Sequence, residues 1–215
     1  MSRFSMSVKG RWFVAGVLLF VLWLLATVPA NLVLAHVCKS VPAFYAEGVT
    51  GTIWSGSAQR VTINPAGFYK DLGETRWRLH PFALLLGKLS VSLNATNGPE
   101  HVTTDASLSV TGRMTLANTD ASVDAAIVRS WIPLPAQFGG HFSVQLKSMS
   151  IADAVADELD GALTWQDAKV DFSGAPIQLG NFVAKLSLGD KKQYRAALSD
   201  LGGNLGVAGQ LQYAP

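Results

Sequence analysis

Hydrophobic and polar residues alternate along most of the chain from Val49 onward. Alternation with a period of two places every second side chain on the same face of an extended strand. Glycine-containing pairs such as Gly98-Pro99 and Gly139-Gly140 separate the alternating segments and predict turns. The pattern therefore predicts about eight to ten short-linked strands in a mainly β fold, an antiparallel meander with one apolar face. The apolar positions of the clearest segments are Leu89, Val91, Leu93 and Ala95; Ala106, Leu108, Val110, Met114 and Leu116; Phe142, Val144 and Leu146; Phe182, Ala184, Leu186 and Leu188; Tyr194, Ala196 and Leu198; and Leu205, Val207, Leu211 and Tyr213.

Two segments depart from this alternation and predict helical structure. Residues 119–131 carry apolar side chains at helical spacing, Val123 and Ile127 among them, and Pro133 follows as a helix terminator. We expect this amphipathic helix to cover part of the sheet. A second, shorter helical turn is expected at 152–159.

The N-terminal part of the chain is apolar over a length that matches a lipid bilayer. The 23 residues 12–34 contain no charged side chain. As a helix they would span about 35 Å, against about 30 Å of hydrocarbon in a bilayer. A cleaved signal peptide ending near Val28-Pro29-Ala30 is the alternative, but its apolar core would have only about 7–15 residues. The length therefore predicts an uncleaved transmembrane anchor at 12–35.

Charge on the two sides of this apolar segment predicts its orientation. Residues 1–11 contain three basic side chains and no acidic one, which predicts a cytoplasmic tail by the positive-inside tendency. Beyond the anchor we predict a linker at 36–48 and a β-rich domain at 49–215 on the opposite side of the membrane. Cys38, the only cysteine, would lie there without an intramolecular disulfide partner.

The composition excludes several classes of function. Charged residues make up only 15% of the chain, below the roughly 25% of ordinary soluble domains. Beyond residue 11 there are 14 basic and 15 acidic residues, so the domain carries no excess of positive charge. Nucleic-acid binding is not expected, because no basic patch is present to neutralise phosphates.

The sequence contains no recognisable motif for catalysis, cofactor binding or metal binding. The four histidines stand singly, without the further ligands that a zinc site needs. The nucleophile-elbow pattern Gly-x-Ser-x-Gly and the phosphate-binding glycine motifs are missing from the sequence. The acidic residues at 153–160 do not have the spacing of a calcium loop and are expected to be solvated.

The tryptophans favour a role in core packing, and a role in binding is the second interpretation. Trp54, Trp77, Trp131 and Trp165 are expected to be core fillers, since one indole ring buries a large area. The alternative is that some of them line a groove for a lipid tail or an extended partner strand. A faint repeat of the Gly51–Trp54 pattern at Gly161–Trp165 also predicts two similar halves.

Two blocks of the sequence resemble a known family. Gly51-Thr52-Ile53-Trp54-Ser55-Gly56-Ser57-Ala58 and the block from Trp77 to Leu89 resemble the two sequence elements of the type II secretion system protein N family, also called general secretion pathway protein N. In physical terms the motif positions are strand-shaping and core-forming, with glycine and proline ending or bending strands. These positions are Gly51, Trp54, Gly56, Trp77, Leu79, Pro81, Leu84, Leu85 and Gly87.

The resemblance implies an accessory component of the inner-membrane platform of type II secretion, the machine that exports folded proteins across the outer membrane. Such a protein would be a non-enzymatic, single-pass inner-membrane protein with a periplasmic domain, and its partners would be other platform proteins. An alternative comes from the one-faced sheet, which also resembles the open β-groove of AsmA-like lipid-transfer proteins and makes lipid a second candidate ligand. A membrane-tethered hydrolase is the third hypothesis, and no set of catalytic residues in the sequence supports it.

Overall fold

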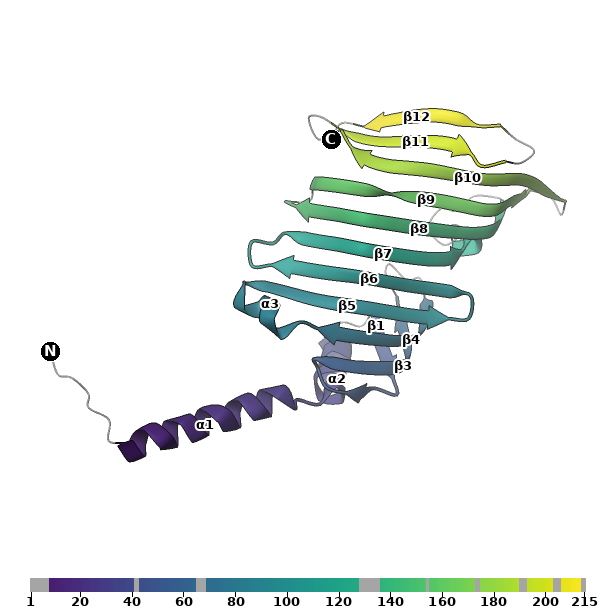
Figure 1. The fold of residues 1–215 in the computed structure, drawn as a ribbon. Coiled ribbons are helices and arrows are strands. Elements are labelled where there is room, and N and C mark those ends of the chain that lie inside the picture. Colours follow the sequence, from purple (N-terminus) through teal and green to yellow (C-terminus); the bar gives the residue numbers. More distant parts are fainter. Residues whose placement is uncertain are drawn as a thin grey trace.

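A computed structural model describes residues 8–40, 43–64, 69–127, 136–153, 155–172, 175–189, 193–202 and 206–213. Within these ranges the chain forms two N-terminal helices followed by a single β-sheet (Figure 1). The helices are α1 (Val8–Ala26), α2 (Ala30–Ser40), α3 (Pro81–Leu85) and the short 3-10 helix η2 (Ala125–Ile127). The strands are β1 (Phe44–Glu47), β2 (Thr50–Gly51), β3 (Ser55–Ile63), β4 (Lys70–Leu79), β5 (Lys88–Asn97), β6 (Glu100–Ser109), β7 (Met114–Asp124), β8 (Gln137–Ala152), β9 (Val155–Asp171), β10 (Pro176–Leu188), β11 (Tyr194–Asp200) and β12 (Ala208–Tyr213).

The sheet is an antiparallel meander, as the alternation predicts. Its order is β1-β3-β4-β5-β6-β7-β8-β9-β10-β11-β12, and β2 pairs with β3 beside this path. From β3 to β12 each strand therefore pairs with the next one along the chain, and Figure 1 shows them stacked in one twisted layer. The sheet has 12 strands rather than eight to ten, since short strands such as β1 and β2 carry little periodicity.

The expected single helix at 12–35 is divided in two. Helix α1 ends at Ala26 and α2 begins at Ala30, so the break falls at Val28 and Pro29. Proline has no backbone N–H and disfavours helical geometry in the residue before it, so it interrupts a continuous helix. Pro29 instead forms an isolated antiparallel bridge with Thr52. Within the described ranges no helix combines the length and apolar character needed to cross a bilayer.

The expected helix at 119–131 is wrong over its first part. Residues 119–124 continue strand β7, and only Ala125–Ile127 are helical, while 128–131 lie outside the described residues. The misleading spacing lies at the end of β7: Val123 still pairs with Phe142 of β8, and the chain then leaves the strand for η2, which ends at Ile127. Earlier in β7, Asn118, with φ of 49°, forms a β-bulge opposite β6, so Leu116 and Thr119 lie on the same face three positions apart.

The second expected helical turn, at 152–159, is also wrong. Strand β8 runs to Ala152 and β9 begins at Val155, with Asp153 in the turn at φ of 51°. The acidic side chains there lie on or between two long paired strands. Asp157 Oδ2 forms an ion pair with Arg113 at 2.7 Å, while its Oδ1 is buried with no hydrogen-bond partner among the described residues.

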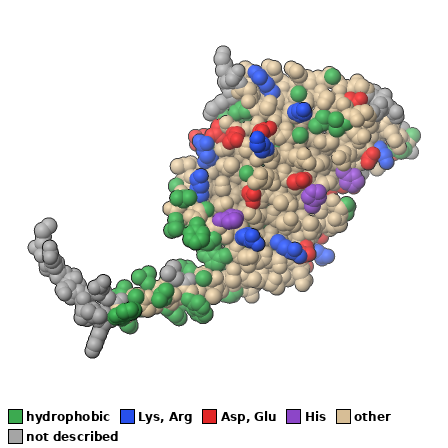
Figure 2. All heavy atoms as spheres, viewed as in Figure 1, with side chains coloured by type: hydrophobic (Ala, Val, Ile, Leu, Met, Phe, Trp, Pro, Cys, Tyr) green, Lys and Arg blue, Asp and Glu red, His purple; other side chains and the backbone are tan. Residues whose placement is uncertain are grey.

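One face of the sheet is apolar and the other polar. The strand registers place apolar side chains opposite each other, for example Val91 beside Ala106 and Val144 beside Leu163. Among the described residues the fully buried hydrophobic side chains are small, alanines and two valines, and no large side chain is less than 2% exposed. Trp54, Trp77 and Trp165 are thus half-buried members of one open layer rather than fillers of a closed core. Figure 2 shows basic, acidic and histidine side chains scattered over the viewed face.

Candidate interaction surfaces

The first motif forms a tight turn around two glycines. Gly51 has φ of 87°, and a Cβ added there would lie 2.6 Å from the backbone oxygen of Ser55. A Cβ on Gly56 would lie 2.5 Å from the ring of Trp77 and 2.6 Å from the backbone oxygen of Thr50. Both positions therefore require glycine, one for its backbone angle and both for space.

The residues between these glycines hold the junction of the two N-terminal helices. The indole N–H of Trp54 donates to the backbone oxygen of Leu25, in the last turn of α1, at 2.8 Å. The backbone N–H of Ile53 donates to the Val28 oxygen at 3.1 Å. Since unpaired carbonyls at a helix C-terminus need external donors, the Trp54 indole satisfies one of these groups, and the bond to Val28 fixes the segment that follows α1 against the sheet.

The second motif interlocks with the first through its tryptophan. Trp77 pairs with Gly56 across β4 and β3, and its indole N–H donates to the Ile53 oxygen at 3.2 Å. The N–H of Leu79 donates to the Trp54 oxygen at 2.7 Å. The two sequence blocks therefore form one structural unit, with the glycine of one block making room for the tryptophan of the other.

The rest of the second motif changes the chain from strand to helix and back. Strand β4 ends at Leu79, and Pro81 occupies the first turn of α3, where a missing N–H costs nothing. Gly87, with φ of 66°, then returns the chain into β5. Leu84 and Leu85 are 45% and 83% exposed, so these motif leucines are surface residues rather than core residues.

An open apolar hollow of about 340 Å³ lies on the apolar face over β8–β11. Its centre is an aromatic group in which the ring of Trp165 lies 5.3 Å from Phe142 and 6.2 Å from Phe182. The indole N–H donates to the Gly139 oxygen at 3.1 Å, which leaves an apolar wall. Trp165 therefore lines an open hollow, while Trp131 lies outside the described residues. The lining residues are Phe142, Leu163, Trp165, Leu179, Phe182, Ala184, Leu198 and Val207.

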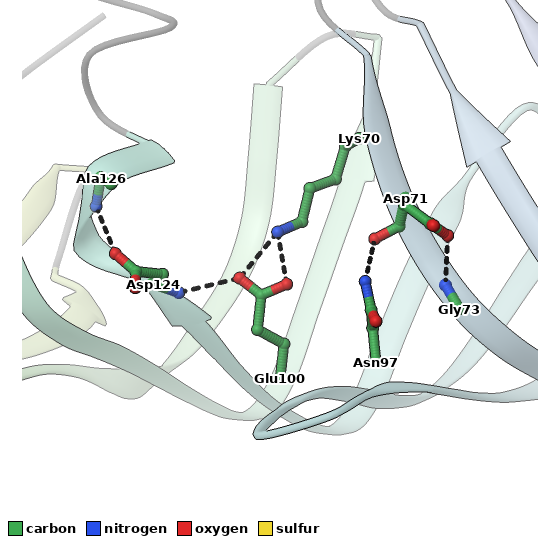
Figure 3. A network of polar contacts seen from close by, with 7 residues as sticks. All are labelled: Lys70, Asp71, Gly73, Asn97, Glu100, Asp124 and Ala126. Carbon is green, nitrogen blue, oxygen red and sulfur yellow. Dashed lines mark hydrogen bonds and ion pairs between the residues drawn. The ribbon is translucent and has the colours of Figure 1, made fainter.

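A charged pair crosses the apolar face near the start of the sheet (Figure 3). Lys70 of β4 donates to Glu100 of β6 at 2.7 Å, and the two side chains are only 20% and 17% exposed. Glu100 also accepts the backbone N–H of Asp124 at 3.0 Å, which joins the end of β7 to the pair. The pair thus links three strands of the sheet. The sequence did not predict this ion pair. Glu100 nevertheless continues the alternation of Val102 and Ala106, so its position in β6 belongs to the apolar face.

On the polar face, a histidine, a serine and an aspartate lie in a row without forming a catalytic triad. Ser92 donates to Asp105 at 2.6 Å, and His80 Nε2 lies 3.1 Å from the Ser92 oxygen. In a serine hydrolase the histidine stands between the two other groups, whereas here the serine does. The hydrogen bonds from Ser92 and then Asn118, with a smaller contribution from His80, hold the pKa of Asp105 below its usual value although partial burial opposes them. The row therefore joins strands β5 to β7.

A larger hollow, about 900 Å³, lies over β7–β12 and is lined by side chains of both charges. Lys147 and Asp160 at its wall are 3.8 Å apart, and Lys185 and Arg195 also line it. In the part of the chain that the structure describes, no group of three or more His, Cys, Asp or Glu side chains is placed to hold a metal ion. Cys38 lies in α2 as a free, partly exposed thiol.

These features define a class: an open, single-layer antiparallel β-sheet with an uncovered apolar face, tied by two tryptophan motifs to a pair of N-terminal helices. Residues 42–215 match the family described as type II secretion system (T2SS), protein N. Because the match covers most of the chain, the chain belongs to this family, and the resemblance of the two sequence blocks is confirmed. The match supports this family rather than the AsmA-like alternative.

Two curated relatives carry the same family name. The type II secretion system protein N of Vibrio cholerae is 27% identical over 141 residues, which is 64% of this chain and 54% of that protein. The protein of the same name from Aeromonas hydrophila is 27% identical over 198 residues, 90% of this chain and 76% of that protein. The aligned region thus spans about half the length of the first relative. No solved structure matches the chain.

Proposed function

We propose that the chain is a non-catalytic scaffold of the type II secretion system that binds platform proteins of the inner membrane through the apolar face of its sheet. The observation that carries this proposal is the hollow around Trp165, which has an apolar lining and is not covered by any described element. Large exposed apolar patches are uncommon on soluble monomers and mark sites of interaction. Binding of this kind needs no catalytic group.

The location that we propose follows the sequence expectations. Residues 12–35 would anchor the protein in the inner membrane, residues 1–11 would be cytoplasmic and the β-domain would be periplasmic. The exposed apolar side chains of α1, from Trp12 to Leu25, support a membrane environment for that helix. Labelling of a cysteine at either end of the chain in intact and permeabilised cells tests the orientation, and labelling of residue 3 in intact cells would contradict it.

The scaffold role is tested by one substitution and its matched control. Leu198 in β11 is 38% exposed at the hollow, and Ser199 is exposed on the opposite face of the same strand, outside both hollows. We expect Leu198→Asp to abolish co-purification of platform subunits with the tagged full chain and to lower exoprotein secretion in a complemented deletion strain. Ser199→Asp should behave as wild type.

Three outcomes would contradict the proposal. Wild-type secretion in the deletion strain would contradict the proposed function. Equal recovery of platform subunits with both variants would contradict the proposed binding surface. Stoichiometric phospholipid in organic extracts of the purified chain, lost in Leu198→Asp, would assign the hollow to lipid instead. Circular dichroism of both variants checks that the sheet remains folded.

A further inference from the structure

A second apolar surface lies far from the hollow, at the end of the sheet where α3 and the turn between β6 and β7 meet. Phe82, Leu85 and Leu86 are 80%, 83% and 79% exposed, and Val110 is 85% exposed. The backbone N–H of Val110 donates to the Gly87 oxygen at 3.0 Å, which holds the turn beside α3. These four residues, the α3 patch, are among the most exposed large apolar side chains of the described chain.

Folding of the sheet does not account for this patch. Helix α3 has only five residues, and none of them is buried. The connection between β4 and β5 can begin its helix with a proline and return to the strand with a glycine, which Pro81 and Gly87 supply, but it does not need apolar side chains facing outward. Contiguous exposed apolar residues on a folded domain indicate a surface that contacts something else.

The position of the α3 patch relative to α1 indicates what that contact is. Trp54 accepts the Leu79 N–H through its backbone oxygen and donates through its indole to Leu25 of α1. Two residues after Leu79 the chain enters α3. The end of α1 and the α3 patch are therefore held at the same corner of the molecule, and Figure 2 shows hydrophobic side chains gathered there beside α1.

The charges around the patch match a layer of phosphate head groups. Between Glu74 and Glu100 the chain has no acidic residue, whereas Arg78 and Lys88 flank α3 on its two sides and are exposed. A short apolar segment with basic residues at its rim is the arrangement of protein surfaces that lie in the bilayer interface. If the patch instead bound another protein, that protein would need a groove complementary to it.

We propose that the α3 patch is a bilayer-contact surface, in which Phe82, Leu85, Leu86 and Val110 enter the head-group and acyl boundary while Arg78 and Lys88 lie against lipid phosphates. Together with α1 this contact gives the β-sheet two points of attachment and a fixed tilt on the membrane. The inference goes beyond the scaffold role and does not depend on which secretion subunit the sheet binds.

The test uses the full chain reconstituted into vesicles of phosphatidylethanolamine and phosphatidylglycerol. In a Cys38→Ser background, the variant Leu85→Cys carries an environment-sensitive fluorophore, and Gln212→Cys on exposed β12 is the matched control. We expect quenching by doxyl-labelled lipid to be at least about threefold stronger at position 85 than at position 212, with iodide quenching in the opposite order. Equal quenching at both positions would overturn the proposal.

A charge variant separates insertion from other causes of protection. Adding Phe82→Asp to the labelled Leu85→Cys chain should abolish lipid quenching while the circular dichroism of the sheet is unchanged. Replacing Arg78 and Lys88 by Gln should weaken quenching in the anionic vesicles but not in vesicles of phosphatidylcholine alone. Protection from iodide without lipid quenching would mean that another protein surface or a second copy covers the patch, and it would overturn the bilayer assignment.

Discussion

Two tryptophans on the same sheet are held in different ways. Trp77 lies across Gly56, and its indole N–H is bonded to the Ile53 oxygen in the neighbouring turn. Trp165 stands in the aromatic group over β8–β10, and its indole N–H is bonded to the Gly139 oxygen. Each indole is satisfied by a backbone carbonyl, but the first ring fits against a glycine and the second ring packs beside other rings.

The difference indicates which region can tolerate change. Around Trp77 the available space is set by backbone atoms of β2 and β3, which cannot move independently of the helix junction. Around Trp165 the neighbours are side chains at an open hollow, which can adjust. The first region should therefore be sensitive to a single added carbon atom, whereas the second should be sensitive mainly to the loss of its ring.

The largest effect is expected when the glycine beneath Trp77 is filled. In Gly56→Val the added carbons meet both the Trp77 ring and the Thr50 oxygen, closer than 3 Å in each case. We expect the free energy of unfolding to fall by about 3 kcal/mol, at the upper end of overpacking effects. Urea denaturation followed by tryptophan fluorescence measures the change.

A matched substitution checks that space, and not glycine flexibility, causes this loss. Gly209 in β12 also lies in a strand, and a Cβ there meets nothing within 4 Å. We expect Gly209→Val to leave stability within about 0.5 kcal/mol of the wild type. A comparable loss in both variants would show that the contact with Trp77 does not set the sensitivity of the first region.

Truncating the second tryptophan should cost somewhat less than a fully buried aromatic would. Trp165 is half-buried, so we expect Trp165→Ala to lower the free energy of unfolding by about 2–3 kcal/mol, below the 3–5 kcal/mol of core truncations. Trp165→Phe keeps the ring packing and should lose only about 1 kcal/mol. Equal losses for the two variants would mean that the hydrogen bond to Gly139, rather than the aromatic group, stabilises this region.

The charged pair on the apolar face gives a smaller expected effect in the first region. Lys70→Met leaves the Glu100 carboxylate half-enclosed without its cation, and we expect a loss of about 1–2 kcal/mol. Adding Glu100→Gln removes the unpaired charge and should restore part of the stability. A double-mutant cycle measured by urea denaturation gives the coupling, and additive losses would show that the pair does not join β4 to β6 energetically.

The sequence predicted the sheet well where the alternation is unbroken. Leu89, Val91 and Leu93 occupy one face of β5 as expected, because a regular ladder keeps the period of two. The prediction failed where a strand passes directly into a short helix, after Asp124, and where a turn residue has positive φ, at Asp153. Strand ends and turns of this kind depend on pairing with neighbouring strands, which a single segment does not reveal.

The candidate surfaces were predicted only in part. The glycine and tryptophan positions of the two motifs could be selected from their residue types, but the bond from Trp54 to Leu25 joins segments 29 residues apart and requires the fold. The pairing of Lys70 with Glu100 likewise joins residues 30 positions apart and requires the fold. Of these residues, only Glu100 could have been singled out from the sequence, because it is a charged residue at a position where the alternation places apolar ones.

The smallest expected effect concerns the opposite, polar face of the first region. The hydrogen bonds from Ser92 and Asn118 favour the ionised form of Asp105, so its pKa is lowered in the folded chain from the ordinary value of 3.8. A carboxyl whose pKa is lowered on folding adds stability above its unfolded pKa and loses that contribution as the pH falls through its folded pKa. Asp105→Asn should therefore be less stable than the wild type at neutral pH, and the difference should shrink once the pH falls below about 4. Stability measured by urea denaturation from pH 7 to pH 3 tests this, with Asp200→Asn at the far end of the sheet as the control. A difference between Asp105→Asn and the wild type that stays constant down to pH 3 would show that the hydrogen bonds, and not the charge they stabilise, join β5 to β7.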